Sequence, residues 1–167
     1  MLPAKDAISE KMCAANPLQV ARFVAAASYA EDSPMVKHEQ ALKIIEAAHV
    51  HAAHINVRVS VAVVDAGGHL VAMGRMDGAS PVSPQIAEAK AVSAAMFQRD
   101  GGSLLQTATE RPAFFNAVSG LTRMQLVPGH GSVLLQHDGS VAGAVGVSGA
   151  KPEQDLECAE AGAGTFS

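Results

Sequence analysis

Apolar side chains recur every three or four positions in several stretches of this chain, a spacing that predicts amphipathic helices. The longest such stretch spans residues 36–54, and we expect it to turn one apolar stripe toward a core. That expected stripe is Leu42, Ile45, Ala48, His49, Ala52 and Ile55. Further helices are expected over residues 16–29, 83–98 and 103–108, and from Pro152 to near the end of the chain.

Two other regions carry short apolar runs on either side of a glycine-containing turn, which is the pattern of a β-hairpin. Residues 57–65 and 70–75 flank a Gly-Gly pair, and glycine accepts the positive φ that tight hairpin turns need. Residues 132–137 and 141–146 flank an Asp-Gly pair in the same way. Frequent prolines and glycines between residues 112 and 131 predict an irregular connection. Hairpins interleaved with helices predict an α+β fold with an antiparallel sheet.

The composition narrows the class of protein. With 167 residues, 49% of them apolar and no Trp, the chain fits one domain whose core consists of small and medium aliphatic side chains. Its apolar runs are shorter than the roughly 20 residues of a membrane-spanning helix. A net charge of −4 without a basic stripe argues against nucleic-acid binding. We therefore expect neither nucleic acid nor a membrane as a partner.

Cys13 and Cys158 are the two cysteines, and their separation matches no metal-binding spacing. We expect both thiols to be reduced, because nothing else in the sequence indicates a disulfide-stabilised secreted protein. Arg22 interrupts the apolar stretch near the N-terminus, whereas an export signal needs an unbroken one. These features favour a cytoplasmic protein.

Three motifs, in this order along the chain, resemble one protein family. They are VVDAGGHLVAMGRMDGA, IAEAKAVSAAMF and DGSVAGAVGVSGAKPEQDLECAEAGAG. With these motifs the chain resembles the GlcG/HbpS-type haem-binding proteins and the C-terminal domain of PduO-type proteins over roughly residues 41–164. We expect residues 1–35, outside the resemblance, to form an N-terminal extension with a short helix, and residues 36–167 to form a GlcG/HbpS-like domain.

The resemblance implies a profilin-like α-β-α fold, with a five-stranded antiparallel sheet and flanking helices, assembled as dimers or higher oligomers. It also implies haem as a candidate ligand, since some members bind haem or take part in its degradation, whereas many have no assigned activity. This chain departs from relatives at two places. Pro128–Val133 replaces a GGxPI-like strand entry, and Asp100–Ser103 stands where relatives often carry a Thr that has been linked to haem contact.

His130 is the leading candidate for chemistry. Glycines flank it on both sides, so its backbone can approach a ligand closely, and an imidazole that titrates near neutral pH serves as acid, base or axial ligand. A histidine in a surface loop is also often just solvated. Under a catalytic interpretation, His130 acts as the general acid or base, and Arg75 or Arg123 holds a substrate carboxylate.

Lys90 and Ser103 complete the candidates. Lys90 lies on or beside the apolar stripe of its expected helix, where its charge either reaches solvent or meets an anion. Under the resemblance, the expected cofactor-binding residues are His130, Lys90 and Ser103. His51 and His54 lie three residues apart on one helix, but no third ligand shares their spacing, so we expect no metal site.

Two functions of different classes follow. The first is a protein that binds a small anionic ligand, with haem or a related tetrapyrrole implied by the resemblance. The second is a cofactor-free isomerase, lyase or hydrolase that acts on a small carbonyl or carboxylate compound of a catabolic pathway, with His130 as its acid–base residue. Alanine-rich helix faces also predict a homo-oligomer of at least two copies. The sequence leaves open whether the protein is an enzyme.

Overall fold

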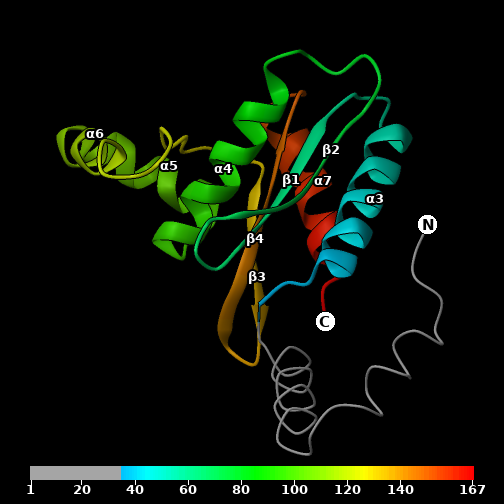
Figure 1. Cartoon of the computed structure of the whole chain (residues 1–167). Coiled ribbons are helices and arrows are strands. Elements are labelled where there is room, and N and C mark those ends of the chain that lie inside the picture. Colours follow the sequence, from blue (N-terminus) through cyan, green and yellow to red (C-terminus); the bar gives the residue numbers. More distant parts are fainter. Residues whose placement is uncertain (1–34) are drawn as a thin grey trace, which may run out of the picture. The chain divides into compact units, whose positions relative to one another are not determined.

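The computed structural model describes residues 35–167, so the expected helix over residues 16–29 and Cys13 lie outside the described part of the chain. The elements follow one another as helix, hairpin, three helices, hairpin and helix (Figure 1). The strands are β1 (Ser60–Asp65), β2 (Leu70–Arg75), β3 (Ser132–His137) and β4 (Ser140–Ser148). The helices are α3 (His38–His54), α4 (Ser83–Phe97), α5 (Gly101–Glu110), α6 (Pro112–Ser119) and α7 (Pro152–Ala163).

The strands form one antiparallel sheet with the order β2-β1-β4-β3. Both expected hairpins are present. The second one turns through Asp138 and Gly139, which have φ values of 49° and 75°, as a two-residue type I′ turn requires. The central strands β1 and β4 are buried along most of their length, whereas β2 and β3 form the edges. The prediction of an α+β fold with an antiparallel sheet is thus confirmed.

The five-stranded sheet implied by the family resemblance is wrong, because the sheet of the described residues has four strands. The segment before β3 stays outside the sheet. Pro128 lacks the N–H that a sheet ladder needs. Gly129 and Gly131 have φ values of 154° and 96°, which do not belong to a strand. β3 therefore remains an edge.

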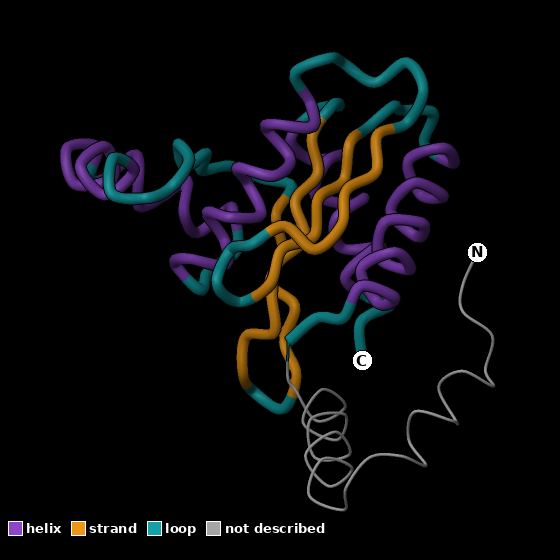
Figure 2. Tube along the Cα trace, viewed as in Figure 1, coloured by secondary structure: helices purple, strands orange, loops and turns teal. Residues whose placement is uncertain are grey.

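Helices cover both faces of the sheet, so that the strands form the middle of three layers (Figure 2). α3 and α7 lie together on one face, and α4 crosses the other. Along β1, Val61 and Val63 belong to the core on the α3–α7 side, and Val64 belongs to the core on the α4 side. Successive strand residues point to opposite faces, so one buried strand supplies both cores.

α3 buries Ile45, Ala48 and Ala52 of the expected stripe, and its buried side is shifted toward Ala41 and Ile44. Leu42, part of the expected stripe, is 49% exposed. The buried residues of α3 are Ala41, Ile44, Ile45, Ala48 and Ala52. Gly162 of α7 packs directly on Ile44 and Ala48, since a Cβ on Gly162 would lie 2.8 Å from the Ile44 carbonyl oxygen. The predicted helical spacing of apolar residues is correct, and the close approach of α7 decides which side of α3 is buried.

α4 is buried on nearly every side, as a helix between a sheet and other elements must be. Its buried residues are Ser83, Ala87, Ala89, Lys90, Ala91, Val92, Ser93, Ala94 and Ala95. Gly146 of β4 permits this close packing, because a Cβ there would overlap the Ala87 carbonyl oxygen and lie 2.7 Å from the Ala91 nitrogen. Small residues on both sides thus bring α4 onto the sheet.

None of the helices within residues 35–167 combines the length and the apolar character that crossing a membrane requires. The longest of them, α3, has 17 residues. Its exposed positions include Lys43 and Glu46.

Candidate functional site

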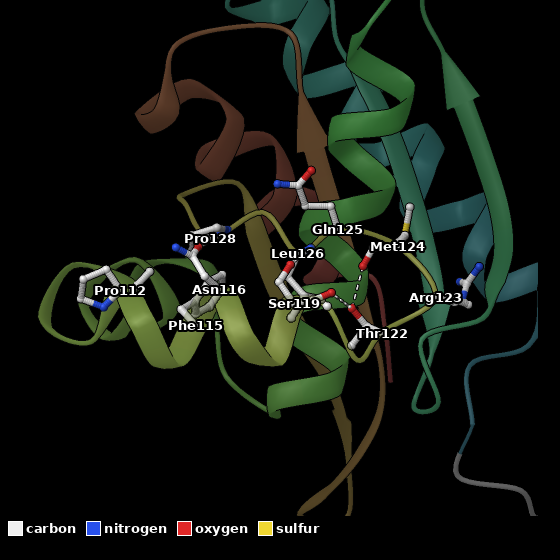
Figure 3. Close-up of a pocket in the computed structure, with 12 residues that line it drawn as sticks. Pro112, Phe115, Asn116, Ser119, Thr122, Arg123, Met124, Gln125, Leu126 and Pro128 are labelled. Atoms are coloured by element: carbon white, nitrogen blue, oxygen red, sulfur yellow. Dashed lines mark hydrogen bonds between the residues drawn. The ribbon is translucent and has the colours of Figure 1, made fainter.

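A hollow of about 760 Å³ opens between α5, α6 and the segment that follows α6 (Figure 3). This size falls within the range of small-molecule sites, about 300–1,000 Å³. The apolar lining residues are Ala108, Pro112, Phe115, Met124, Leu126 and Pro128. The polar side chains of the lining are Asn116, Ser119, Thr122, Arg123 and Gln125. The hollow therefore offers an apolar surface with several hydrogen-bonding groups and one cation.

Phe115 and Leu126 are the most buried part of this lining. They are 5% and 4% exposed, and both belong to the core on the α4 side of the sheet. The Phe115 ring stacks on that of Phe97 at the end of α4, with centroids 5.7 Å apart and planes 10° from parallel. This contact anchors α6 to α4, so the floor of the hollow is continuous with the core.

Hydrogen bonds hold the segment that follows α6 in its irregular path. Thr122 Oγ1 lies 2.9 Å from the Ser119 carbonyl oxygen and 2.6 Å from the Met124 carbonyl oxygen (Figure 3). Further along, Ser93 Oγ on the buried α4 accepts the Val127 N–H at 2.9 Å. The wall of the hollow is therefore tied to α6 at one end and to α4 at the other.

Arg123 brings a positive charge to the hollow, at the opposite end from Pro112 (Figure 3). Its guanidinium donates to the Gly68 carbonyl oxygen and lies 3.7 Å from the Glu88 carboxylate, with the Arg123 side chain 50% exposed. A guanidinium has five N–H donors. The two contacts therefore leave donors that can bind an anionic ligand.

The two segments that depart from the family pattern meet in space. Gly101, at the start of α5, is buried, and a Cβ there would overlap the Gly129 carbonyl oxygen. The His130 ring packs against Gly102, where a Cβ would lie 3.2 Å from Cε1 and 3.4 Å from Nδ1. Glycine is what lets these backbones approach so closely. The contacts place His130 beside the first turn of α5, which contains Ser103.

Asp100 precedes α5 but does not cap it. Its carboxylate accepts the Leu134 N–H of β3 at 2.8 Å, and no side-chain cap bond forms at this helix end. Ser132 Oγ is buried 2.6 Å from where a Gly101 Cβ would lie, and it has no hydrogen-bond partner among the described residues. Uncapped helix N-termini attract anions, and the Asp100 carboxylate opposes this attraction.

Lys90 is buried and does not reach solvent. Its Nζ donates to the Asp155 carboxylate and to the Val147 carbonyl oxygen, each at 2.9 Å, and the two charged side chains are 9% and 4% exposed. Asp155 also accepts the Ala150 N–H at 3.0 Å. Burial raises the pKa of the Asp155 carboxyl above its ordinary value, and the bonds from Lys90 and Ala150 oppose that rise. The anion that Lys90 meets thus belongs to the protein itself.

Arg75 and Ser103 are both exposed. The Arg75 guanidinium donates to the Ala79 carbonyl oxygen in the turn after β2. Ser103 lies in the first turn of α5, where its carbonyl oxygen accepts the Thr107 hydroxyl at 3.2 Å. The structure thus places His130 against Gly102, the residue before Ser103, Arg123 on the hollow, and Arg75 at the turn after β2.

Neither the α3 histidines nor Cys158 forms a reactive cluster. His51 and His54 line a second hollow, of about 570 Å³, and His51 Nε2 lies 3.6 Å from the Glu157 carboxylate of α7. In residues 35–167, no three His, Cys, Asp or Glu side chains are arranged to hold a metal ion. Burial raises the pKa of Cys158 to about 11, which makes its thiol a poor nucleophile.

The hollow was not predicted from the sequence because α6 was not predicted. We expected an irregular connection there, whereas Pro112 occupies the first turn of a helix, a position that proline favours. The signal was present: Phe114, Phe115 and Val118 follow Pro112 at helical spacing. Met124, which lines the hollow, carried no comparable signal.

Comparisons with known proteins agree with this architecture. Protein GlcG of Escherichia coli is 34% identical over 114 residues, which are 68% of this chain and 81% of GlcG. The crystal structure of a PduOC:heme complex matches with a TM-score of 0.71 and 27% identity, over 80% of this chain and 96% of that one. A crystal structure of a double mutant of Streptomyces reticuli HbpS matches with a TM-score of 0.73 and 28% identity, over 81% of this chain and 90% of that one.

The family described as "Haem degrading protein HbpS-like" matches residues 36–164. This range contains all three motifs and every helix and strand from α3 to α7. The resemblance found in the sequence is thereby confirmed, and the chain belongs to the HbpS-like family.

Proposed function

We propose that this protein binds haem or a related tetrapyrrole in the hollow between α5 and α6. The observation that carries the proposal is the lining of this hollow, where a buried apolar floor of Phe115 and Leu126 lies near the Arg123 guanidinium. A planar macrocycle with carboxylate side chains needs both kinds of surface. The PduOC neighbour was solved as a haem complex, which supports this ligand class.

Met124 lines the hollow, whereas His130 lies outside its lining, two residues after the lining residue Pro128. Imidazole nitrogen and thioether sulfur are common axial ligands of haem, and the chain offers His130 at the α5 N-terminus and Met124 in the lining. Bound haem would supply an iron centre whose redox potential depends on its axial ligand and on the polarity around it. The protein's own part is to exclude water with the apolar floor and to orient the ligand.

Two groups of donors can hold carboxylates. Arg123 keeps free N–H donors beside the hollow, and a guanidinium binds a carboxylate through two parallel hydrogen bonds. Ser103 and the His130 ring, beside the first turn of α5, offer a second group of donors. Pro128, which lines the hollow, is adjacent in sequence to Gly129 in the loop that contacts this helix end. We therefore assign His130, Ser103 and Arg123 to ligand binding.

Haem titration of the full chain, followed by the Soret band, tests the proposal. We expect a saturable Soret shift at micromolar haem, and we expect His130→Ala to weaken binding while the fold is retained, since a loop residue adds little packing. His54→Ala is the matched control, because His54 is exposed on α3 and lines the other hollow. A wild-type protein with no saturable shift overturns the proposal and leaves the cofactor-free enzyme as the better hypothesis.

We also propose that the protein self-associates. α3 exposes Leu42 and Val50, at 49% and 65%, on its outer side, and burial of such side chains at an interface stabilises oligomers. Light scattering at micromolar concentration should give at least twice the chain mass of 17.1 kDa. A mass of one chain across that range contradicts this proposal and leaves the ligand proposal untouched.

A further inference from the structure

The buried ion pair of Lys90 and Asp155 lies directly under the loop that carries His130. Gly131 rests on both members of the pair: a Cβ there would lie 2.7 Å from Asp155 Cβ and 3.0 Å from Lys90 Nζ. Gly131 also has a positive φ of 96°, a backbone conformation that favours glycine. The residue that follows His130 is therefore fixed by contact with the pair.

Val147 of β4 connects the pair to this loop a second time. Its N–H donates to the Gly131 carbonyl oxygen at 2.7 Å, and its carbonyl oxygen accepts from Lys90 Nζ at 2.9 Å. One peptide segment of β4 thus holds the loop with its N–H and the lysine with its C=O. Displacement of Lys90 would move the acceptor and the loop together.

The other side of the loop is fixed as well. Gly129 contacts the start of α5 at Gly101, and the His130 ring lies against Gly102. His130 is therefore held between two close backbone contacts, one with α5 and one with the ion pair. Its imidazole has little freedom to move while both contacts persist.

We propose that Lys90 and Asp155 are positioning residues for His130. They set the place of the imidazole through Gly131 and Val147, and they do not touch the ligand themselves. The inference rests on the proposed function only in so far as His130 binds the ligand; the placement of the ring can be tested without any ligand. It changes the role of Lys90 from a cofactor-binding residue to a residue that acts through the loop.

The energetics of buried ion pairs support a positioning role. The free-energy cost of removing two charges from water is about as large as the free energy gained from their attraction. An apolar pair of similar volume therefore often gives equal or higher stability. A buried pair is therefore weak evidence for stability and is better explained by the geometry that its directional bonds impose. Here the bonds from Lys90 and Asp155 join α4, β4 and the start of α7 at the point where Gly131 passes.

The test replaces the pair by apolar side chains in the full chain, with Lys90→Met and Asp155→Leu combined so that no unpaired charge is buried. We expect this double variant to fold. In the ligand-free protein, the imidazole NMR signals of His130, assigned with His130→Ala, should shift or broaden. The haem dissociation constant should rise about tenfold or more, as is typical when the support of a metal-binding group is removed.

Ile44→Val is the matched control, because Ile44 is fully buried on α3 in the core between the sheet and the α3–α7 layer. It should leave the His130 signals and haem affinity unchanged. If the apolar pair does not fold, Asp155→Glu replaces it, since this variant keeps both charges but pushes against Gly131, and the same NMR shift is expected. If a folded variant at this pair leaves the NMR signals of His130 unchanged, the positioning proposal is overturned. If the wild-type protein does not bind haem, only the proposed function is overturned.

Discussion

The two helical layers that cover the sheet are built differently. On one face α3 and α7 lie side by side and close an aliphatic core, in which Ile44, Val61 and Val145 are fully buried. On the other face the alanine-rich α4 lies on the strands, and α5 and α6 extend away from it (Figure 1). The hollow and Arg123 belong to this second side, and so does the His130 loop, apart from the contact of Gly131 with Asp155 of α7. We infer that the α3–α7 layer mainly stabilises the fold and that the α4–α6 layer carries the ligand site.

The largest effect on stability is expected in the α3–α7 layer. Ile44→Ala removes a fully buried side chain and should lower the free energy of unfolding by about 2–5 kcal/mol, through lost burial and a cavity. Urea unfolding followed by circular dichroism measures it. The folded fraction should bind haem with unchanged affinity. A clear loss of affinity would show that the two layers are not separable in this way.

Gly101→Ala tests the closest contact in the α4–α6 layer. Its new methyl group would overlap the Gly129 carbonyl oxygen, so the loop must move, at a cost of about 1–3 kcal/mol. Because His130 moves with that loop, haem affinity should also fall about tenfold or more. Gly164→Ala is the control, since a Cβ there meets its nearest neighbour at an ordinary 3.4 Å. Equal effects of both substitutions on haem affinity would contradict the assignment of the site.

Arg123→Met should separate ligand binding from stability. The Arg123 side chain is half exposed and its ion pair with Glu88 is long, so its removal should change the free energy of unfolding by less than about 1 kcal/mol. Loss of a charged hydrogen bond to the ligand should raise the haem dissociation constant about tenfold. Arg75→Met, outside the hollow, should leave that constant unchanged. The reverse result would place the carboxylate-binding residue at the turn after β2.

The smallest effect concerns His49, on the sheet-facing side of α3. Burial lowers the pKa of His49 below 6.5, with a backbone hydrogen bond at Gly74 opposing the shift. A lowered pKa means that the folded state disfavours the proton, so His49 contributes stability above pH 6.5 that is lost as the pH falls below it. Urea midpoints at pH 7.5 and 5.5 should therefore differ less in His49→Gln than in the wild type. An unchanged difference between these midpoints would contradict the prediction.

The sequence predicted the parts of the fold that depend on neighbouring residues. Both hairpins were expected, because a Gly-Gly or Asp-Gly pair between apolar runs acts locally. The helices that begin at Ser83 and Pro152 were expected because proline in a first turn is also a local signal. α6 was missed although the same signal stood at Pro112, since the prolines and glycines around it favoured an irregular connection. The fifth strand came from the resemblance alone, and residues 35–167 do not form it.

For the candidate site, the sequence indicates individual residues but not the contacts between them. The sequence singled out His130, Lys90, Ser103 and Arg123 one by one, from the chemistry of each side chain. It could not place His130 against Gly102 or rest Gly131 on the Lys90–Asp155 pair, because these contacts join segments that are distant along the chain. The sequence also could not predict which side of α3 faces the core, because the packing of Gly162 on α3 decides it. Residue types and spacing determined the elements; the tertiary structure decided which surfaces meet, because burial depends on contacts between elements.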